Sequence, residues 1–326
     1  MTPDPLSVLS DAVRVRELVG VLRALEDEGA VPLVFKGAAL AHTLYEESWQ
    51  RPHSDADVLI APESRERVFA VLRRLGYKQL TFISGDLVMY QAPFERVDHL
   101  GIEHVVDIHW RIANPQIVSE VVTHHELVAR SVRMLALSER SSRGGRDEGE
   151  SNGQDYAMRV PSPVDSLLIA CVHRAAHHPD VERRCWIEDI HRLASGLTRS
   201  EWQMFTARAV DRSVRTICLQ GLKRAEAMFQ TTLPLDVVTA LETGPSEASA
   251  VFVRKGLRPI DRLAADLRAL GPVGSARLLR EHLVPPADYM QAKYGVSSRA
   301  WLPAYYVSRV LNGFRKWWRP YVSAAR

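Results

Sequence analysis

The sequence predicts a mixed α/β (α+β) domain with a small mixed sheet, followed by an all-helical C-terminal domain. Short apolar strands alternate with amphipathic helices over 8–112, whereas a helical hydrophobic period dominates from Pro163 onward. The segment 138–155, SERSSRGGRDEGESNGQD, lies between these patterns and is too polar and glycine-rich to bury a core. We therefore predict domains over 1–137 and 159–326, with a flexible linker or hairpin insertion over 138–158.

The predicted elements of the first domain follow from local patterns. Residues 8–29 repeat apolar side chains at helical spacing and end at Gly29, and the helix beginning at Pro62 ends near Gly76. In chain order we predict a helix over 8–29, a strand over 31–35, a helix over 36–47, a strand over 56–61, a helix over 62–77, and strands over 86–93 and 102–112. The residues that flank 138–155 could pair as two further strands.

The second domain reads as helix almost throughout. We predict helices over 163–178, 181–195, 199–230, 234–242, 246–256, 258–270, 275–283 and 303–317. The tail RVLNGFRKWWRPY mixes aromatic and basic residues, which fits a terminal helix with docked apolar side chains or a membrane- or nucleic-acid-binding surface.

Composition limits the class of protein. With 46% hydrophobic and 25% charged residues among 326, the chain has the balance of a soluble globular protein. A net charge of +3 permits a polyanionic partner without arguing for one. The three cysteines form no CxxC pair, and no apolar run approaches the ~18 residues of a membrane span. We expect a cytoplasmic protein without a membrane span.

The stretch RPHSDADVLI, residues 51–60, carries the first chemical signal. Asp55 and Asp57 lie two residues apart at the start of a strand, so their side chains point to the same face. Two carboxylates on one face repel each other, and the cations that oxygen ligands favour are Mg²⁺ and Mn²⁺. The spacing therefore indicates a divalent metal site.

Two further features belong with this pair. Strand 31–35 is followed by Gly37, which allows close approach to a phosphate, and the next helix offers free N–H groups to an anion. Asp107, in VVDIHW, has apolar neighbours, so its carboxylate requires a metal or an ion pair, for which Arg111 is a candidate. Three carboxylates on adjacent strands could hold two ions for phosphoryl or nucleotidyl transfer.

These motifs resemble the nucleotidyltransferase superfamily of DNA polymerase β, and most closely a bacterial branch known as the uncharacterised nucleotidyltransferase family. The similar stretches are LVFKGAALAHTLY, RPHSDADVLI, VVDIHWRI, LLIACVHRAAHH, WIEDIHRL and PPADYMQAKYG, which span most of 31–295. The resemblance implies that Asp55, Asp57 and Asp107 bind metal and form the catalytic centre, with Asp107 also accepting the proton of the attacking hydroxyl. It implies that Gly37 approaches the triphosphate.

The turn departs from the superfamily, which usually has Gly-Ser or Gly-Gly where this chain has Gly37-Ala38. The hydroxyl that often touches phosphate is therefore absent, and Lys36 or Arg51 could compensate with charge. Ser54 is a further candidate for nucleotide contact, although Lys36, Arg51 and Ser54 could equally serve loop or surface hydrogen bonds. His109 shares the face of Asp107, where it could touch a phosphate, orient a carboxylate or act structurally.

We predict a metal-dependent nucleotidyltransferase that uses Mg²⁺ or Mn²⁺ to move a nucleoside monophosphate from a nucleoside triphosphate, such as ATP, to an acceptor hydroxyl. The acceptor could be a small molecule, a peptide or RNA. The helical domain would bind it, with His173, Arg174 and His177 lining the cleft. Two alternatives are a non-catalytic nucleotide-binding or regulatory protein on the same fold, and a DxD glycosyltransferase. The second is disfavoured because only about 54 residues precede Asp55, too few for a Rossmann-like nucleotide domain.

Overall fold

The structure is a computed structural model that describes residues 5–80, 85–137, 156–177, 183–295 and 298–317. The chain forms two compact units. The first comprises Met1–Gln79, Pro93–Trp110 and His124–Ser162, and the second comprises Leu80–Ala92, Arg111–Thr123 and Pro163–Arg326. Each unit is thus built from segments far apart in sequence. Of the linker or hairpin insertion predicted over 138–158, residues 138–155 lie outside the described residues, and 156–158 belong to strand β7 (Tyr156–Val160).

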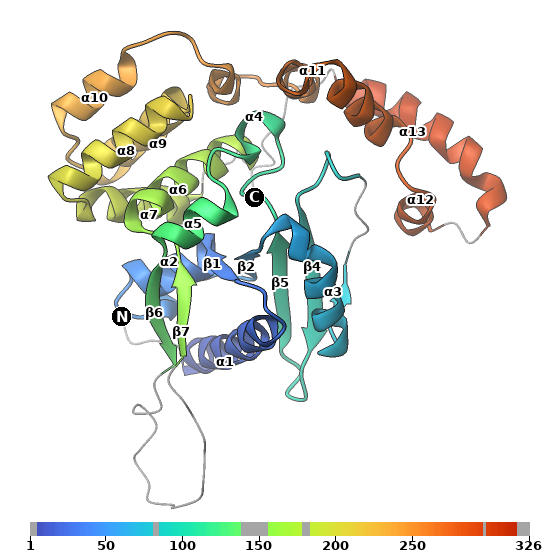
Figure 1. Ribbon diagram of the computed structural model, residues 1–326, viewed down its shortest axis with the longest axis horizontal. Helices are drawn as coiled ribbons and strands as arrows, with labels where there is room; N and C mark the ends of the chain where they lie inside the picture. The colour runs from blue at the N-terminus through green and yellow to red at the C-terminus, as the bar shows by residue number, and fades with distance from the viewer. Residues whose placement is uncertain (1–4, 81–84, 138–155, 178–182, 296–297, 318–326) are drawn as a thin grey trace, which may run out of the picture. The chain divides into compact units, whose positions relative to one another are not determined.

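The first unit contains the sheet. Its elements are α1 (Pro5–Asp27), β1 (Leu33–Phe35), α2 (Lys36–Leu44), β2 (Ala56–Leu59), α3 (Arg65–Arg74), β3 (Lys78–Gln79), β4 (Gln91–Val97), β5 (Glu103–His109), α5 (His124–Arg130), β6 (Val132–Leu137) and β7 (Tyr156–Val160). Within the described residues, five strands pair in the order β1-β2-β5-β4-β3 (Figure 1). Antiparallel β1–β2 and β3–β4 pairs and a parallel β2–β5 pair confirm the predicted mixed sheet.

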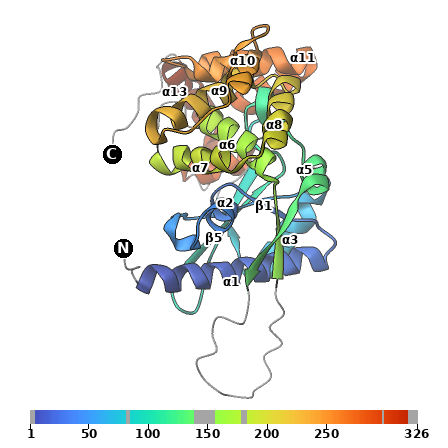
Figure 2. The same cartoon turned by 90° about the vertical axis from the view of Figure 1, so that its left-hand side faces the viewer.

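Apolar burial explains why these segments form a sheet. All three residues of β1 are fully buried, as are Val58 and Leu59 on β2 and Ile108 on β5. Helix α1 contacts β5 and the β6–β7 hairpin, and its inward face buries Leu18, Leu22 and Leu25 (Figure 2). Since strands buried on both faces are held in one register by their side chains, the polar residues on β2 and β5 take fixed positions.

The second unit is helical. Its helices are α4 (Gln116–Ser119), α6 (Pro163–His177), α7 (Arg184–Gly196), α8 (Arg199–Asp211), α9 (Arg215–Phe229), α10 (Leu235–Glu242), α11 (Pro259–Leu283), α12 (Ala287–Tyr294) and α13 (Leu302–Trp317). Helices α6, α7 and α9 pack on one another and bury Cys171, Ile187 and Leu222 completely. This arrangement confirms the predicted helical C-terminal region. In the described parts of the chain, no helix has the length and apolarity needed to cross a bilayer.

Several predicted elements differ from the structure. The strand predicted over 86–93 is wrong for its first half, because β4 begins only at Gln91. There the Leu87 N–H donates to the Glu281 carboxylate and the Tyr90 N–H to the Asn114 side chain, so neither donates to a neighbouring strand. The single helix predicted over 199–230 is two helices, α8 and α9, separated by a left-handed residue, Ser213, with φ of 54°.

The other differences are smaller. Helices predicted over 258–270 and 275–283 form one element, α11, with non-helical backbone at Gly271 (φ 66°) just before Pro272. Helices α4, α5 and α12 were not predicted, and neither was strand β3. All four are short, and short elements give too few repeats for a period to be recognised.

Candidate functional site

Asp57 and Asp107 lie side by side in the sheet. Strands β2 and β5 run parallel, and their register pairs Asp57 directly with Asp107. Because the strands are hydrogen-bonded neighbours, the two side chains project from the same face about 5 Å apart at the backbone. Both residues are buried, with 7% exposure each. Two like charges at this depth require a compensating positive group.

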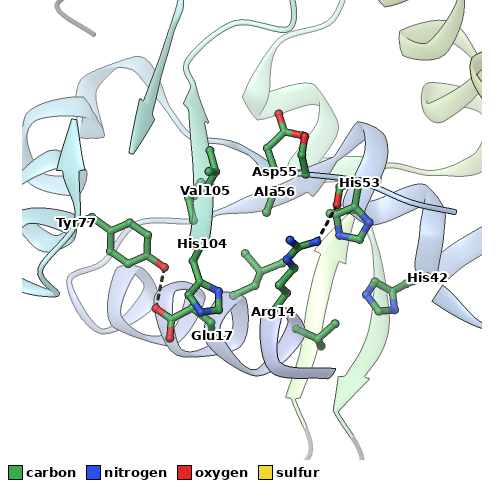
Figure 3. A pocket seen from close by; sticks show the side chains of 14 residues that line it. Arg14, Glu17, His42, His53, Asp55, Ala56, Tyr77, His104 and Val105 are labelled. Atoms are coloured by element: carbon green, nitrogen blue, oxygen red, sulfur yellow. Dashed lines mark hydrogen bonds between the residues drawn. The ribbon is translucent and has the colours of Figure 1, made fainter. Parts of the chain in front are cut away.

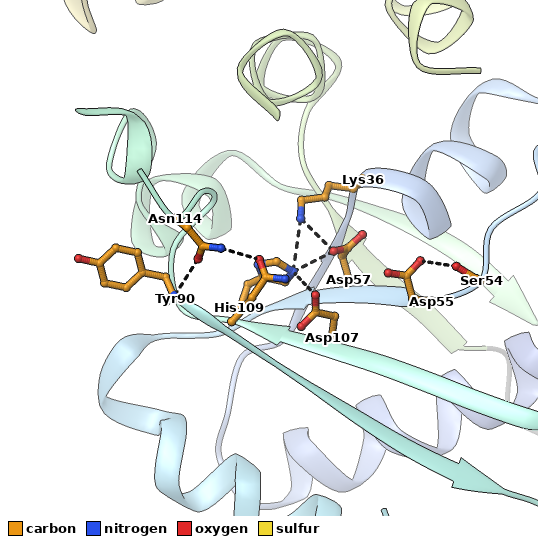
Figure 4. A network of polar contacts seen from close by, with 9 residues as sticks. Lys36, Ser54, Asp55, Asp57, Tyr90, Asp107, His109 and Asn114 are labelled. Carbon is orange, nitrogen blue, oxygen red and sulfur yellow. Dashed lines mark hydrogen bonds and ion pairs between the residues drawn. The ribbon is translucent and has the colours of Figure 1, made fainter. Parts of the chain in front are cut away.

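His109 provides part of that compensation. It follows Asp107 by two residues on β5 and therefore shares its face. Its Nε2 lies 2.8 Å from Asp57 Oδ1 and 3.2 Å from Asp107 Oδ2 (Figure 4). The ring meets Phe35 edge-on at 5.0 Å between centroids and is 1% exposed, so its position is fixed by packing.

Lys36 provides the rest. Its Nζ lies 2.9 Å from Asp57 Oδ1 and 3.3 Å from His109 Nε2 (Figure 4). Lys36 begins α2 directly after β1, whose last residue, Phe35, is the register partner of Asp57. The backbone of Lys36 is left-handed, with φ of 53°, whereas Gly37 carries no such angle. The tight turn expected from Gly37 is therefore made by Lys36.

The charges in this cluster shift one another's ionisation. Burial alone would raise the pKa of Asp57, but the Lys36 ammonium and the hydrogen bond from His109 outweigh it and hold that pKa far below its ordinary value. Burial and the Lys36 charge act to lower the pKa of His109, yet the two carboxylates raise it overall. These shifts favour the ionised form of Asp57 and increase the protonated fraction of His109 at any given pH.

Asp57, Asp107 and His109 form a group that could hold a metal ion. Among the described residues, one ligand atom from each of these three lies within 4.8 Å of the others. Two carboxylate oxygens and one imidazole nitrogen are a donor set that divalent ions accept. The residues present therefore fit a divalent ion, which would bind the neutral form of the His109 imidazole.

Asp55 does not belong to this group of three. Its half-buried carboxylate accepts a hydrogen bond from the Ser54 hydroxyl at 3.2 Å (Figure 4). Its pKa is nevertheless raised, first by burial and then by the negative charges of Asp57 and Asp107. The charges of Asp57 and Asp107 therefore act on Asp55, although one of its oxygens, Oδ1, accepts the hydrogen bond from Ser54.

The remaining predicted nucleotide residues surround the turn. Arg51 is 6% exposed, and a Cβ added to Gly37 would lie 2.9 Å from its Nη1. Gly37 thus gives the Arg51 guanidinium room beside the start of α2. Ala38 is 2% exposed, so its side chain packs inward rather than toward a ligand.

A pocket in the same unit lies between α1 and the sheet. Its cavity volume is about 30 Å³, and Ala38, Ser54 and Asp55 contribute to its wall. Asp55 is among the side chains labelled in Figure 3. Most of its polar side chains bind one another or nearby groups: Tyr77 donates to Glu17 at 2.7 Å, and Arg14 donates to the His53 carbonyl at 3.2 Å. Asp57, Asp107 and His109 are not among its lining residues.

The residues predicted to line an acceptor cleft lie in the second unit, on α6. The rings of His173 and His177 stack at 5.0 Å between centroids, and Trp186 meets His173 edge-on at 6.2 Å. Arg174 is 5% exposed and donates to the Gln220 side chain. Their assignment to a substrate cleft stays a prediction.

Sequence reasoning placed His109 near the carboxylates, but not as a member of the group with Asp57 and Asp107. The signal was available, because DIH repeats the two-residue spacing of DAD. The Lys36 contact carried no comparable signal, since it depends on a left-handed backbone that sequence patterns assign to glycine.

The chain was compared with known proteins. The antibiotic-resistance factor ANT(2'')-Ia shares 17% identity over 65% of this chain and 98% of its own, with a TM-score of 0.40. An antigenic nucleotidyltransferase-like protein from Paracoccidioides brasiliensis shares 16% identity over 67% of this chain and 97% of its own, with a TM-score of 0.37. At TM-scores this low, neither similarity supports an assignment of function to this chain. No curated protein sequence matches the chain significantly.

A family model supplies the decisive comparison. The model described as uncharacterised nucleotidyltransferase matches residues 8–230, more than half of the chain. The match includes Lys36, Asp57, Asp107 and His109, and thus the whole cluster described above. This chain therefore belongs to the family of uncharacterised nucleotidyltransferases.

Proposed function

We propose that this protein is a metal-dependent nucleotidyltransferase that moves a nucleoside monophosphate from a nucleoside triphosphate to an acceptor hydroxyl. The observation that carries the proposal is the pairing of Asp57 with Asp107 on neighbouring strands, with His109 completing a group of three ligand atoms within 4.8 Å. Membership of a nucleotidyltransferase family supports the same reaction class.

Asp57, Asp107 and His109 would hold a divalent ion, which would supply positive charge and orientation for a triphosphate. Carboxylates suit both Mg²⁺ and Mn²⁺, whereas an imidazole nitrogen is a poorer partner for Mg²⁺ than for Mn²⁺. The donor set therefore favours Mn²⁺ in binding measurements, with Mg²⁺ as the second ion to test. Asp55, two residues from Asp57, is the candidate for a further oxygen ligand.

In the proposed reaction, the acceptor oxygen bonds to the α-phosphorus and the bond to the β-phosphate oxygen breaks, so that pyrophosphate leaves. The Asp107 carboxylate takes the proton of the hydroxyl. The residues proposed to contact the nucleotide are Lys36, Gly37, Arg51 and Ser54, with Ala38 contributing through its backbone only. A small molecule, a peptide or RNA would be the acceptor, and His173, Arg174 and His177 are proposed to contribute to its binding.

Product analysis tests this proposal. Each of the four ribonucleoside triphosphates, labelled at the α-phosphate, is incubated with Mg²⁺ or Mn²⁺ and with water as the default acceptor. We expect slow, metal-dependent formation of nucleoside monophosphate and pyrophosphate, lost in Asp107→Asn. Formation of diphosphate and inorganic phosphate instead would contradict attack at the α-phosphorus, and release of a nucleoside diphosphate from a nucleotide-sugar would favour the glycosyltransferase.

One observation favours a second candidate, a non-catalytic nucleotide-binding or regulatory protein. The Lys36 ammonium already neutralises the Asp57 carboxylate, with its Nζ 2.9 Å from Oδ1. If the Lys36 ammonium never left Asp57, it would keep the cluster neutral, no metal ion would bind there, and the site would be inactive. That protein would bind nucleotide without a divalent ion and would give no product in the assay above.

A further inference from the structure

Lys36 is held in place by two contacts of its ammonium. The ammonium bonds Asp57 Oδ1 at 2.9 Å and stands 4.8 Å above the centre of the Phe35 ring. The side chains of Lys36 and Asp57 are each only 10% exposed. A cation between an anion and an aromatic face in so dry a position is bound more firmly than a surface lysine.

The backbone supports the same conclusion. Lys36 is one of three non-glycine residues in the described chain with positive φ, and it stands at the junction of β1 and α2. A left-handed lysine is unfavourable, and such residues persist where the surroundings hold them. Here the holding contacts are those made by its own ammonium, so the turn and the ion pair depend on each other.

The ammonium and a divalent ion compete for the same carboxylate. Lys36 and His109 both bond Asp57 Oδ1, and Asp57 belongs to the group of three potential metal ligands. A divalent ion bound there would meet the charge of Lys36 at short range, where repulsion is strong. Lys36 must therefore withdraw from Asp57 when such an ion binds.

We propose that Lys36 is an internal cation that competes with the divalent ion for Asp57 and, once displaced, binds the triphosphate. The second half of this inference rests on the proposed function of the site; the first half does not. The consequence is cooperativity: the metal alone binds weakly because it must displace Lys36, whereas the metal–nucleotide complex offers the displaced ammonium a new anionic partner.

The test measures two binding affinities, which the loss of the Lys36 ammonium should change in opposite directions. Free Mn²⁺ is titrated by electron paramagnetic resonance into wild-type protein and Lys36→Met without nucleotide. We expect the variant to bind Mn²⁺ about tenfold more tightly, because the competing charge-assisted hydrogen bond is gone. The preformed Mn²⁺ complexes of the four α,β-methylene nucleoside triphosphates are then titrated calorimetrically, and the variant should bind them about tenfold more weakly.

Matched variants keep the result interpretable. Lys36→Gly also removes the ammonium, suits positive φ and should show the same two changes. Lys223→Met removes an exposed lysine paired with Glu226 and should change neither affinity. Equal or weaker Mn²⁺ binding by both Lys36 variants would overturn the competition. A different result is also possible: both Lys36 variants bind Mn²⁺ more tightly, but wild-type protein binds no Mn²⁺–nucleotide complex. That result would support competition between Lys36 and the ion and refute the proposed role of Lys36 in nucleotide binding.

Discussion

Asp57 is the residue on which the site depends, since its Oδ1 accepts hydrogen bonds from both Lys36 and His109. Sequence spacing alone suggests that removing its charge relieves carboxylate repulsion and leaves folding nearly intact. The buried ion pair reverses this expectation, because the loss of one partner leaves the other charge uncompensated.

We therefore expect Asp57→Asn to lower the free energy of unfolding of the metal-free protein by about 2 kcal/mol. Urea unfolding at pH 7 in the presence of a chelator measures it. Asp288→Asn is the control: its side chain is 67% exposed beside Arg299, so its effect should stay below about 0.5 kcal/mol. An Asp57→Asn variant as stable as wild type would mean that repulsion from Asp107 offsets the Lys36 pair.

The features of the site that follow from the geometry of a single strand could be predicted from the sequence. The two-residue period of a strand is enough to place Asp55 and Asp57 on one face, and Asp107 and His109 on one face. Which of the first two carboxylates approaches Asp107 depends on register, and β2–β5 pairing selects Asp57. Register and the left-handed turn at Lys36 are properties of the packed sheet, which local patterns do not contain.

Between elements, Asp266 connects α11 to the start of α4. It accepts the backbone N–H of Ile117 at 3.4 Å. Burial is the largest influence on the pKa of Asp266 and raises it from 3.8 to about 6. Hydrogen bonds from the backbone N–H groups of Ile117 and Gln116 and the charge of Arg262 act in the opposite direction and are smaller. Since the folded state binds this proton more tightly than the unfolded chain, protonation stabilises the fold as pH falls through about 6 toward 3.8.

The resulting prediction concerns a difference between two stability profiles. The rise from 3.8 to about 6 corresponds to about 3 kcal/mol of stability lost as pH increases through that window. Asp266→Asn cannot titrate, so its free energy of unfolding, relative to wild type, should increase between pH 4 and 7. The control is Asp236→Asn, because the Asp236 side chain is 58% exposed; its free energy of unfolding relative to wild type should not change with pH. If the free energy of unfolding of Asp266→Asn relative to wild type is also independent of pH, burial does not raise the pKa of Asp266.

The contact of α6 with α9 gives a second prediction at this scale. A Cβ added to Gly221 on α9 would lie 2.9 Å from the Cys171 sulfur on α6, which is too close without movement of a buried group. Gly221→Ala should lower the free energy of unfolding by about 1–2 kcal/mol despite its better helix propensity. Gly20→Ala on α1, with nothing within 4 Å, should instead raise it by up to about 1 kcal/mol. Thermal and urea unfolding of both variants measure the contrast.

Over the whole molecule, periodicity predicted the mixed sheet and the helical C-terminal region. Two segments that precede Pro163 group with the helical unit: Leu80–Ala92, which follows β3, and Arg111–Thr123, which follows β5. Their ties are tertiary: the Glu281 carboxylate accepts the Leu87 N–H at 2.7 Å, across 194 positions of sequence. A local pattern cannot register such a contact, which explains the error at 86–90.

Asp57, Asp107 and His109 are proposed to bind a divalent ion together. Pulsed electron paramagnetic resonance of Mn²⁺ added in equal amount to the protein tests this proposal directly, because a bound imidazole gives a nitrogen coupling that water does not. We predict a ¹⁴N coupling in wild-type protein, its loss with retained Mn²⁺ binding in His109→Gln, and weakened binding in Asp107→Asn. A nitrogen coupling that persists in His109→Gln, or Mn²⁺ affinity that is the same in wild type and Asp107→Asn, would contradict the account.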